Sequence, residues 1–161
     1  MLITFQMEDC KPVLTPIITG CKLSLEYSSK GVDQRLYRSM IGSLLYVIAS
    51  RLDVMQAIGQ VARFLAAPKE SHIIVVKRIL RYLKGTVEYG LWYPKANDLV
   101  MQAYTDPDWA GSVDDCKSTS RAAFYLGGYL VSWLSKNKSS ISLSTAEAEY
   151  IVAAACCTQV L

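Results

Sequence analysis

The chain has 161 residues, of which 52% are hydrophobic and 19% are charged. This length suits one domain, or two small ones, with an apolar core, so a disordered chain is excluded as the default. No apolar run approaches the roughly 18 residues that a membrane span needs, and the N-terminal residues lack the pattern of a signal peptide. We therefore expect an intracellular protein, cytoplasmic or nuclear, with no membrane partner.

Charge is distributed unevenly along the chain. Residues 69–95 carry six basic and two acidic side chains, whereas residues 96–161 carry four basic and seven acidic ones. A cationic segment next to an anionic one suits a protein that binds a polyanion with the first and coordinates cations with the second. The five cysteines are odd in number and match no ligand spacing with the single His72. Neither a disulfide partner nor a zinc site is predicted.

The first part of the chain predicts an irregular start followed by helices. Prolines and glycines are scattered through residues 1–32, which we expect to form an extended lead-in. Apolar residues then recur at helical spacing over 34–49. Ser50 and Asp53 fit a capping box that would begin a second helix. A preceding proline and a following glycine delimit a third helix over 69–84.

The third predicted helix carries a basic face. Lys77, Arg81 and Lys84 recur at i, i+4 and i+7, and Arg78 widens the face. Lysine and arginine contact nucleic-acid phosphates without reading sequence, so a nucleic-acid-binding face is one interpretation. A solvated helix face explains the same pattern, and from this helix alone we favour it.

Beyond residue 86 the periodicity becomes strand-like. We expect strands at 87–93 and 99–105, with Asp106-Pro107-Asp108 breaking the second because proline cannot donate to a central ladder. A polar loop over 112–120 follows.

Two more strands and a helix complete the pattern. Strands at 122–126 and 129–135 are separated by Gly127-Gly128, which suits a tight hairpin turn. The sequence S-T-A-E at 144–147 fits a capping box for a helix that runs to residue 161. The fold class is therefore α+β.

Two carboxylates stand out in this second half. Asp106 ends a strand and Glu149 lies early in the last helix, so both could reach one edge of a sheet. Grouped carboxylates bind hard cations such as magnesium, and a pair of metal ions assists phosphodiester cleavage. Spacing alone equally fits a turn residue at Asp106 and an exposed helix charge at Glu149, and that interpretation is the more common one.

Four ordered motifs resemble the ribonuclease H domain of copia-type retrotransposon Pol polyproteins. They are Y-T-D-P-D-W-A-G at 104–111, D-C-K-S-T-S at 115–120, S-W-L-S-K at 132–136 and L-S-T-A-E-A-E-Y at 143–150. Upstream segments resemble the end of the same family's reverse transcriptase. They are D-C-K-P at 9–12, Y-R-S-M-I-G-S-L-L-Y at 37–46, S-R-L-D at 50–53 and K-R-I-L-R-Y-L-K-G-T at 77–86.

The resemblance implies a function for each half of the chain. Residues 33–86 would be a reverse-transcriptase thumb or connection segment that contacts a template-primer duplex, which strengthens the nucleic-acid interpretation of the basic face. Residues 87–161 would be a truncated ribonuclease H-like fold, a three-stranded antiparallel meander plus one helix. Such enzymes cut the RNA strand of an RNA/DNA hybrid with Mg²⁺ or Mn²⁺. Asp106 and Glu149 would be the first and second metal-binding carboxylates.

Departures from the family pattern predict a fragment that is inactive alone. The family's third carboxylate lies on a strand after the last helix, and the polymerase aspartates lie upstream of Met1. Pro107 stands where a small residue is usual, Leu52 replaces a proline, Cys116 replaces a basic residue and Arg121 replaces a glycine. An uncovered sheet edge and apolar face predict marginal stability or aggregation.

Two alternatives remain open at this point. One is a noncatalytic nucleic-acid-binding module that uses the basic helix 69–84. The other is an active nuclease that recruits its missing half from the remaining Pol segments.

Overall fold

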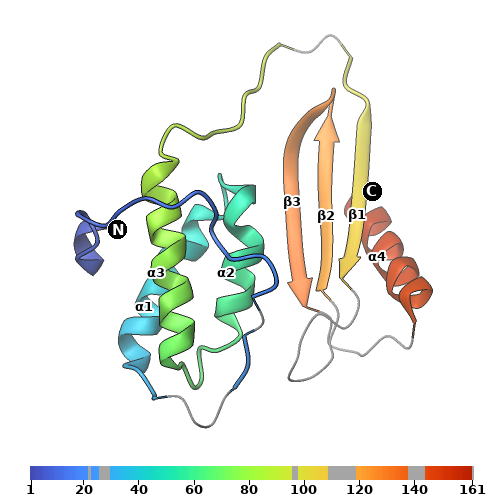
Figure 1. Ribbon diagram of the computed structural model, residues 1–161. Coiled ribbons are helices and arrows are strands. Elements are labelled where there is room, and N and C mark those ends of the chain that lie inside the picture. Colours follow the sequence, from blue (N-terminus) through green and yellow to red (C-terminus); the bar gives the residue numbers. More distant parts are fainter. Residues whose placement is uncertain (22, 26–29, 96–97, 109–118, 138–143, 161) are drawn as a thin grey trace. The chain divides into compact units, whose positions relative to one another are not determined.

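The chain forms two compact units, Met1–Gly90 and Leu91–Leu161, in the computed structural model (Figure 1). The structure describes all residues except 22, 26–29, 96–97, 109–118, 138–143 and 161. The first unit is helical, and the second combines an antiparallel sheet with one helix. The predicted α+β fold class is confirmed.

The described residues of the first unit form three α-helices and two short 3-10 turns. The α-helices are α1 (Gln34–Val47), α2 (Met55–Ala62) and α3 (Glu70–Gly85), and the 3-10 turns are η1 (Ile3–Phe5) and η2 (Leu52–Val54). Asp33 caps α1, because its carboxylate accepts a hydrogen bond from the Arg35 backbone N–H at 2.8 Å. The three helices that the sequence predicted are confirmed, and α3 begins one residue later than expected.

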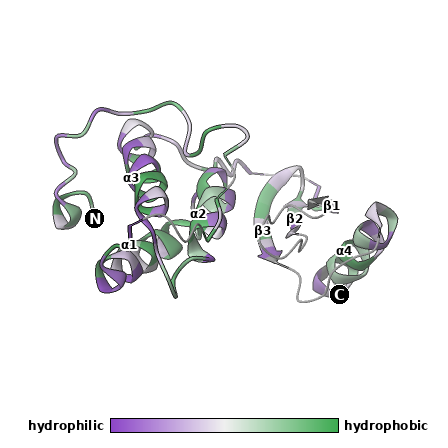
Figure 2. Ribbon diagram, turned by 60° about the horizontal axis from the view of Figure 1, so that its bottom comes forward, coloured by the Kyte–Doolittle hydropathy of each residue, from purple (hydrophilic) through white to green (hydrophobic). Residues whose placement is uncertain are grey.

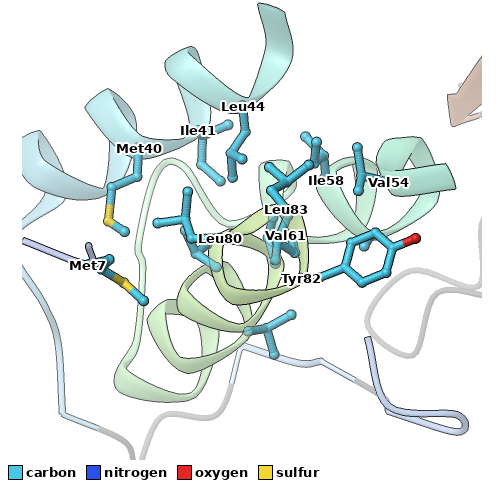
Figure 3. Packing of buried hydrophobic residues seen from close by; sticks show 14 of the residues in the cluster. Met7, Met40, Ile41, Leu44, Val54, Ile58, Val61, Leu80, Tyr82 and Leu83 are labelled. Atoms are coloured by element: carbon cyan, nitrogen blue, oxygen red, sulfur yellow. The ribbon is translucent and has the colours of Figure 1, made fainter. Parts of the chain in front are cut away.

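Side chains from all three helices fill the core of this unit (Figure 3). Tyr37 and Leu44 of α1, Ile58 of α2, and Ile79 and Leu80 of α3 are fully buried. The Tyr37 hydroxyl donates a hydrogen bond to the Val61 carbonyl at 2.8 Å, which satisfies its polar group inside the core. The buried faces of the three helices therefore meet one another.

The capping box predicted for Ser50 and Asp53 is wrong. The residue before α2 is Val54, and no side chain caps that helix. The Ser50 hydroxyl donates to the Val47 carbonyl at 3.4 Å instead. The Asp53 carboxylate accepts hydrogen bonds from Arg51 and Tyr82 instead. The Asp53 carboxylate thus forms a charge-assisted hydrogen bond with Arg51 in place of the predicted capping interaction.

The single histidine has a structural role at the start of α3. His72 is completely buried, and its Nδ1 accepts a hydrogen bond from the Lys69 backbone N–H at 3.0 Å. Its Nε2 lies 3.0 Å from the Ser24 carbonyl oxygen, and its ring stacks on Phe64 with 3.8 Å between centroids. The ring nitrogen facing the carbonyl must carry the hydrogen, because the other nitrogen accepts. His72 therefore links α3 to the lead-in.

In the second unit, the part of the chain that the structure describes forms a meander of three strands followed by one helix. The elements are β1 (Met101–Asp108), β2 (Thr119–Leu126), β3 (Tyr129–Asn137) and α4 (Thr145–Val160). The sheet order is β1-β2-β3 with antiparallel pairing. Gly127 and Gly128 have φ values of 59° and 82° in the two-residue turn between β2 and β3. Glycine adopts positive φ without steric cost, and the predicted tight hairpin is confirmed.

The strand predicted at 87–93 is wrong. This segment straddles the boundary between the two units and belongs to no described strand. The Tyr89 N–H donates to the Thr86 carbonyl at 3.1 Å, so the chain turns as it leaves α3. Farther on, the Tyr93 hydroxyl donates to the Leu130 carbonyl at 2.6 Å. None of the described strands pairs with the alternating apolar residues of this segment.

Strand β1 continues through the proline that was expected to end it. Pro107 is paired with Ser120 of β2, and the strand runs on to Asp108. Because β1 lies at an edge of the described sheet, a missing N–H is tolerated when it faces away from the partner strand. Strand β2 also begins earlier than predicted, at Thr119, while the rest of the predicted polar loop lies outside the described residues.

Helix α4 covers one face of the sheet. Ala148, Val152 and Cys156 recur at i, i+4 and i+8 and are buried, with Ala122 and Phe124 of β2 buried in the same unit. Cys156 joins these two β2 residues in one apolar cluster. The Ser144 hydroxyl accepts a hydrogen bond from the Glu147 backbone N–H at 3.1 Å, which confirms the Ser144 half of the predicted capping box.

Candidate functional site

Asp106 lies on β1 directly opposite Arg121 of β2. Arg121 donates a hydrogen bond through Nη1 to Oδ2 of Asp106 at 2.9 Å, which also forms an ion pair. The Arg121 side chain is 26% exposed and that of Asp106 is 70% exposed. The guanidinium therefore lies close to the sheet, and the carboxylate that it meets is open to solvent.

The register places Asp106 on the face of the sheet that α4 leaves open. Thr105 is paired with Ala122, which is buried under α4, and successive strand residues point to opposite faces. Tyr104 and Tyr125 also lie on the open face by this alternation, and their rings meet edge to face with 5.6 Å between centroids. Asp106 and Arg121 thus continue an aromatic, solvent-facing surface.

Glu149 lies in the first turns of α4, one residue after buried Ala148, and it is exposed. Helix α4 packs against both β1 and β2, so the two predicted carboxylates come from neighbouring elements of one unit. By the register, Asp106 lies on the face of the sheet opposite to α4, so the strand and the helix do not by themselves bring the two carboxylates to one face. Convergence of Asp106 and Glu149 on one metal ion stays a prediction.

The described residues do not fit a two-metal centre. No group of three or more histidine, cysteine, aspartate or glutamate side chains gathers anywhere in the described ranges. Carboxylate oxygens are the donors that Mg²⁺ and Mn²⁺ prefer, which suits Asp106 and Glu149. However, Asp106 already has a cationic partner in Arg121. Asp114 and Asp115 lie outside the described residues.

The predicted basic face of α3 is largely occupied by the lead-in. Arg78 donates to the Thr15 carbonyl at 3.1 Å and to its hydroxyl at 2.9 Å. Arg81 donates to the Lys11 carbonyl at 2.7 Å. Lys84 donates to the carbonyls of Glu8 and Cys10, the latter at 2.9 Å. Lys77 is exposed. Three of the four residues predicted to contact phosphate thus donate hydrogen bonds to the protein's own backbone.

Close packing at the end of α3 supports the same attachment. A side chain at Gly85 would place its Cβ 2.9 Å from the Cβ of Pro12, which is closer than real Cβ atoms approach. Residues 8–15 therefore seat against α3 only because position 85 has no side chain. Helical periodicity gave no sign of this contact, since the partners lie more than 60 residues apart.

Arg51 organises a polar cluster between the start of α2 and the end of α3. It donates through Nη1 to the Thr86 carbonyl at 2.8 Å and through Nη2 to Oδ2 of Asp53 at 2.7 Å. The Tyr82 hydroxyl donates to the same Asp53 oxygen at 2.7 Å. The hydrogen bond from Arg51 lowers the pKa of Asp53, and burial together with Asp53 raises the pKa of Tyr82. The cluster therefore connects the segment before α2 to the end of α3.

This cluster joins two of the segments on which the family resemblance rests. S-R-L-D at 50–53 supplies Arg51 and Asp53, and the segment 77–86 supplies Tyr82 and Thr86. The guanidinium also lies over the Tyr82 ring at 5.8 Å from its centroid. The sequence analysis did not assign these residues a joint role, although the short spacing of Arg51 and Asp53 was a usable signal.

Other features of the described residues concern the predicted partners. Cys10, Cys21, Cys156 and Cys157 are free thiols. None of the described helices combines the length and apolar character needed to cross a membrane.

The four described α-helices and the three-stranded antiparallel sheet define an α+β protein consistent with part of a ribonuclease H-like fold. The chain is 41% identical over 150 residues to the retrovirus-related Pol polyprotein from transposon RE1 of Arabidopsis thaliana, covering 93% of this chain and 10% of that protein. It is 40% identical over 156 residues to the corresponding polyprotein from transposon TNT 1-94 of Nicotiana tabacum, covering 92% and 12% respectively. The chain belongs to the copia-type retrovirus-related Pol polyproteins of transposons.

The chain spans about a tenth of the length of these two relatives. It is also 35% identical over 144 residues to an uncharacterized mitochondrial protein of Arabidopsis thaliana, covering 60% of that shorter protein. No protein-family profile matches the chain. No solved structure matches it either.

Proposed function

We propose that the second unit derives from a ribonuclease H that cuts the RNA strand of RNA/DNA hybrids, and that this chain does not cut them by itself. Asp106 and Glu149 are its metal-binding, catalytic positions. The first unit, by the same proposal, is the end of a reverse transcriptase. The expected partners are an RNA/DNA hybrid or another nucleic acid and the remaining segments of a Pol polyprotein.

One observation carries the proposal: the meander and helix put Asp106 on the first strand and Glu149 early in the helix that packs on it, within a chain of the Pol family. Asp106 and Glu149 are oxygen donors of the kind that would hold Mg²⁺ or Mn²⁺, and such an ion would supply a nucleophilic water and stabilise the leaving oxygen. Inactivity is supported by the ion pair on Asp106 and by the absence of a third ligand among the described residues.

The first test is cleavage of a labelled RNA/DNA hybrid in Mg²⁺ and in Mn²⁺ by the purified chain, with Asp106→Asn and Glu149→Gln as controls. We expect the native chain to cut no faster than either variant. Cutting that both substitutions abolish would contradict the proposed inactivity and make the chain a nuclease.

A second test addresses the assignment of the two carboxylates. The matching 150 residues of the RE1 polyprotein are replaced by this chain carrying Arg121→Gly, and the unmodified polyprotein is the positive control. We expect the chimera to cut the hybrid and to lose cutting with Asp106→Asn or Glu149→Gln. A folded chimera that cuts equally well with both carboxylates replaced would overturn the assignment.

The contacts of α3 weigh against the alternative of a noncatalytic nucleic-acid-binding module. Arg78, Arg81 and Lys84 hold backbone carbonyls of the lead-in, so reversing their charge would disturb the fold as well as any phosphate contact. Lys77 is the clean probe, because it is exposed. Unchanged hybrid binding by Lys77→Glu would argue against a role for this face, and a reduced salt dependence would favour one.

A further inference from the structure

We infer that Arg121 supplies the positive charge at Asp106 that a divalent metal ion would supply in an active nuclease, and thereby excludes that ion. The inference rests on the proposed function, because it takes Asp106 as a metal-binding position. It goes beyond that function by naming the residue of this chain that determines whether the position accepts a metal.

The geometry makes Arg121 a fixed feature of this carboxylate. The two residues are direct partners in the antiparallel register, so their side chains leave the sheet on the same face. Nη1 of Arg121 lies 2.9 Å from Oδ2 of Asp106. Arg121 is the less exposed partner, at 26% against 70%, so the sheet surface holds the cation and the carboxylate meets it.

The chemistry of the two cations makes them competitors. A guanidinium remains protonated throughout the working pH range, so its charge does not disappear when a metal approaches. An exposed ion pair is itself weak, and a divalent ion could displace one hydrogen bond. The decisive effect is therefore repulsion between the fixed guanidinium and an ion bound to the same carboxylate, since like charges about 5 Å apart in a water-like medium weaken binding roughly tenfold or more.

The described residues around Asp106 supply too few further negative charges to offset this repulsion. No group of three potential metal ligands exists among the described residues, so few other side chains there could bind a metal ion together with Asp106. With one carboxylate already neutralised, the remaining attraction for a divalent ion falls further. Removing the guanidinium should produce a weak cation site, because the Asp106 carboxylate would then have no fixed positive charge 2.9 Å away to repel a divalent ion.

The test is a titration with Mn²⁺ alone, followed by the loss of the electron paramagnetic resonance signal of the free ion. The full chain is compared as native protein, Arg121→Gly, Arg121→Lys, and Arg121→Gly combined with Asp106→Asn. We expect the Gly variant to gain one site at least tenfold tighter than any in the native chain. The Lys variant should remain like the native chain, and the double variant should lose the gained site.

A threonine variant protects the test against misfolding. Glycine weakens a strand, whereas threonine is favoured in strands and carries no charge, so Arg121→Thr should show the same gain if Arg121→Gly fails to fold. Binding by the native chain that Asp106→Asn abolishes would overturn the inference. So would the lack of any gain in folded Gly and Thr variants, because Arg121 would then not decide metal access.

This readout is separate from the test of the proposed function. Metal binding gained on removal of Arg121, together with a chimera that ignores both carboxylates, would refute the nuclease assignment and leave the inference standing. A chimera that cuts equally well with arginine or glycine at position 121 would refute the inference and leave the nuclease assignment intact.

Discussion

The helical unit and the sheet unit bury their apolar side chains to different extents. In the helical unit, three helices and the lead-in surround a core in which Tyr37, Leu44 and Ile58 are fully buried. In the sheet unit, the described buried cluster lies between β2 and α4, and Tyr104 on the open face is 60% exposed. A meander has two faces, and one helix covers only one of them. Stability therefore concentrates in the unit that carries no proposed chemistry.

The largest expected effect probes the closed core. Leu80→Ala should lower the stability of the helical unit by about 2–5 kcal/mol, since it removes a fully buried side chain and leaves a cavity. Hydrogen exchange read separately for the two units provides the measurement, with Lys77→Ala on the same helix as the exposed control. Equal loss of protection in both units would break the contrast, because it would show that they unfold together.

Disrupting the polar cluster around Arg51 should give the next largest loss of stability. Arg51→Met should cost about 2–3 kcal/mol of stability, because it leaves Asp53 and the Thr86 carbonyl without their charged donor.

The same cluster should make stability depend on pH. The pKa of Asp53 is lowered in the folded chain, so the contribution of Asp53 to stability is complete above the usual carboxyl range and is lost as the pH falls through the lowered value. Denaturant titrations across acidic pH should therefore show a shallower decline for Asp53→Asn than for the native chain.

A smaller effect should separate structural from ligand-binding roles on α3. Arg81→Gln should cost about 1 kcal/mol and increase proteolysis within residues 8–15, because it weakens the bond to the Lys11 carbonyl. Lys77→Gln, on the same helix, should change neither quantity. Unaltered proteolysis of the lead-in in the Arg81 variant would show that this hydrogen bond does not hold it.

The hairpin offers a matching probe inside the sheet unit. Gly128→Ala should cost about 1 kcal/mol, because φ is 82° there and open space around the residue makes the strain purely a backbone effect. The loss should appear in the amides of β2 and β3 alone. Gly31→Ala, where nothing lies within 4 Å and no positive φ occurs, is the control.

The fold was predictable wherever local pattern decides structure. Apolar spacing located α1, a proline and a glycine delimited α3, and Gly127-Gly128 located the hairpin, because these signals act over a few residues. The prediction failed at 87–93, where the alternating pattern pairs with none of the described strands. It also failed at Pro107, because a sequence does not show which strand lies at an edge.

The candidate site was predictable in its residues and not in their partners. The motifs located Asp106 and Glu149, whose joint role remains a prediction. The pairing of Asp106 with Arg121 depends on the register between β1 and β2, and the long connection between those strands does not fix a register. The partners of Arg78, Arg81 and Lys84 depend on contacts across 63 to 76 residues, which helix periodicity cannot report.

The attachment of the lead-in to α3 has a consequence for the order in which the chain is made. Residues 8–15 are synthesised more than 60 residues before Arg78 and Arg81, with which they form hydrogen bonds. Synthesis proceeds at about 5–20 residues per second, so the lead-in waits several seconds on the ribosome without its partners. Its apolar residues, Met7 among them, have no helix α3 to pack against during that interval. The lead-in therefore reaches its final place only after α3 has been made.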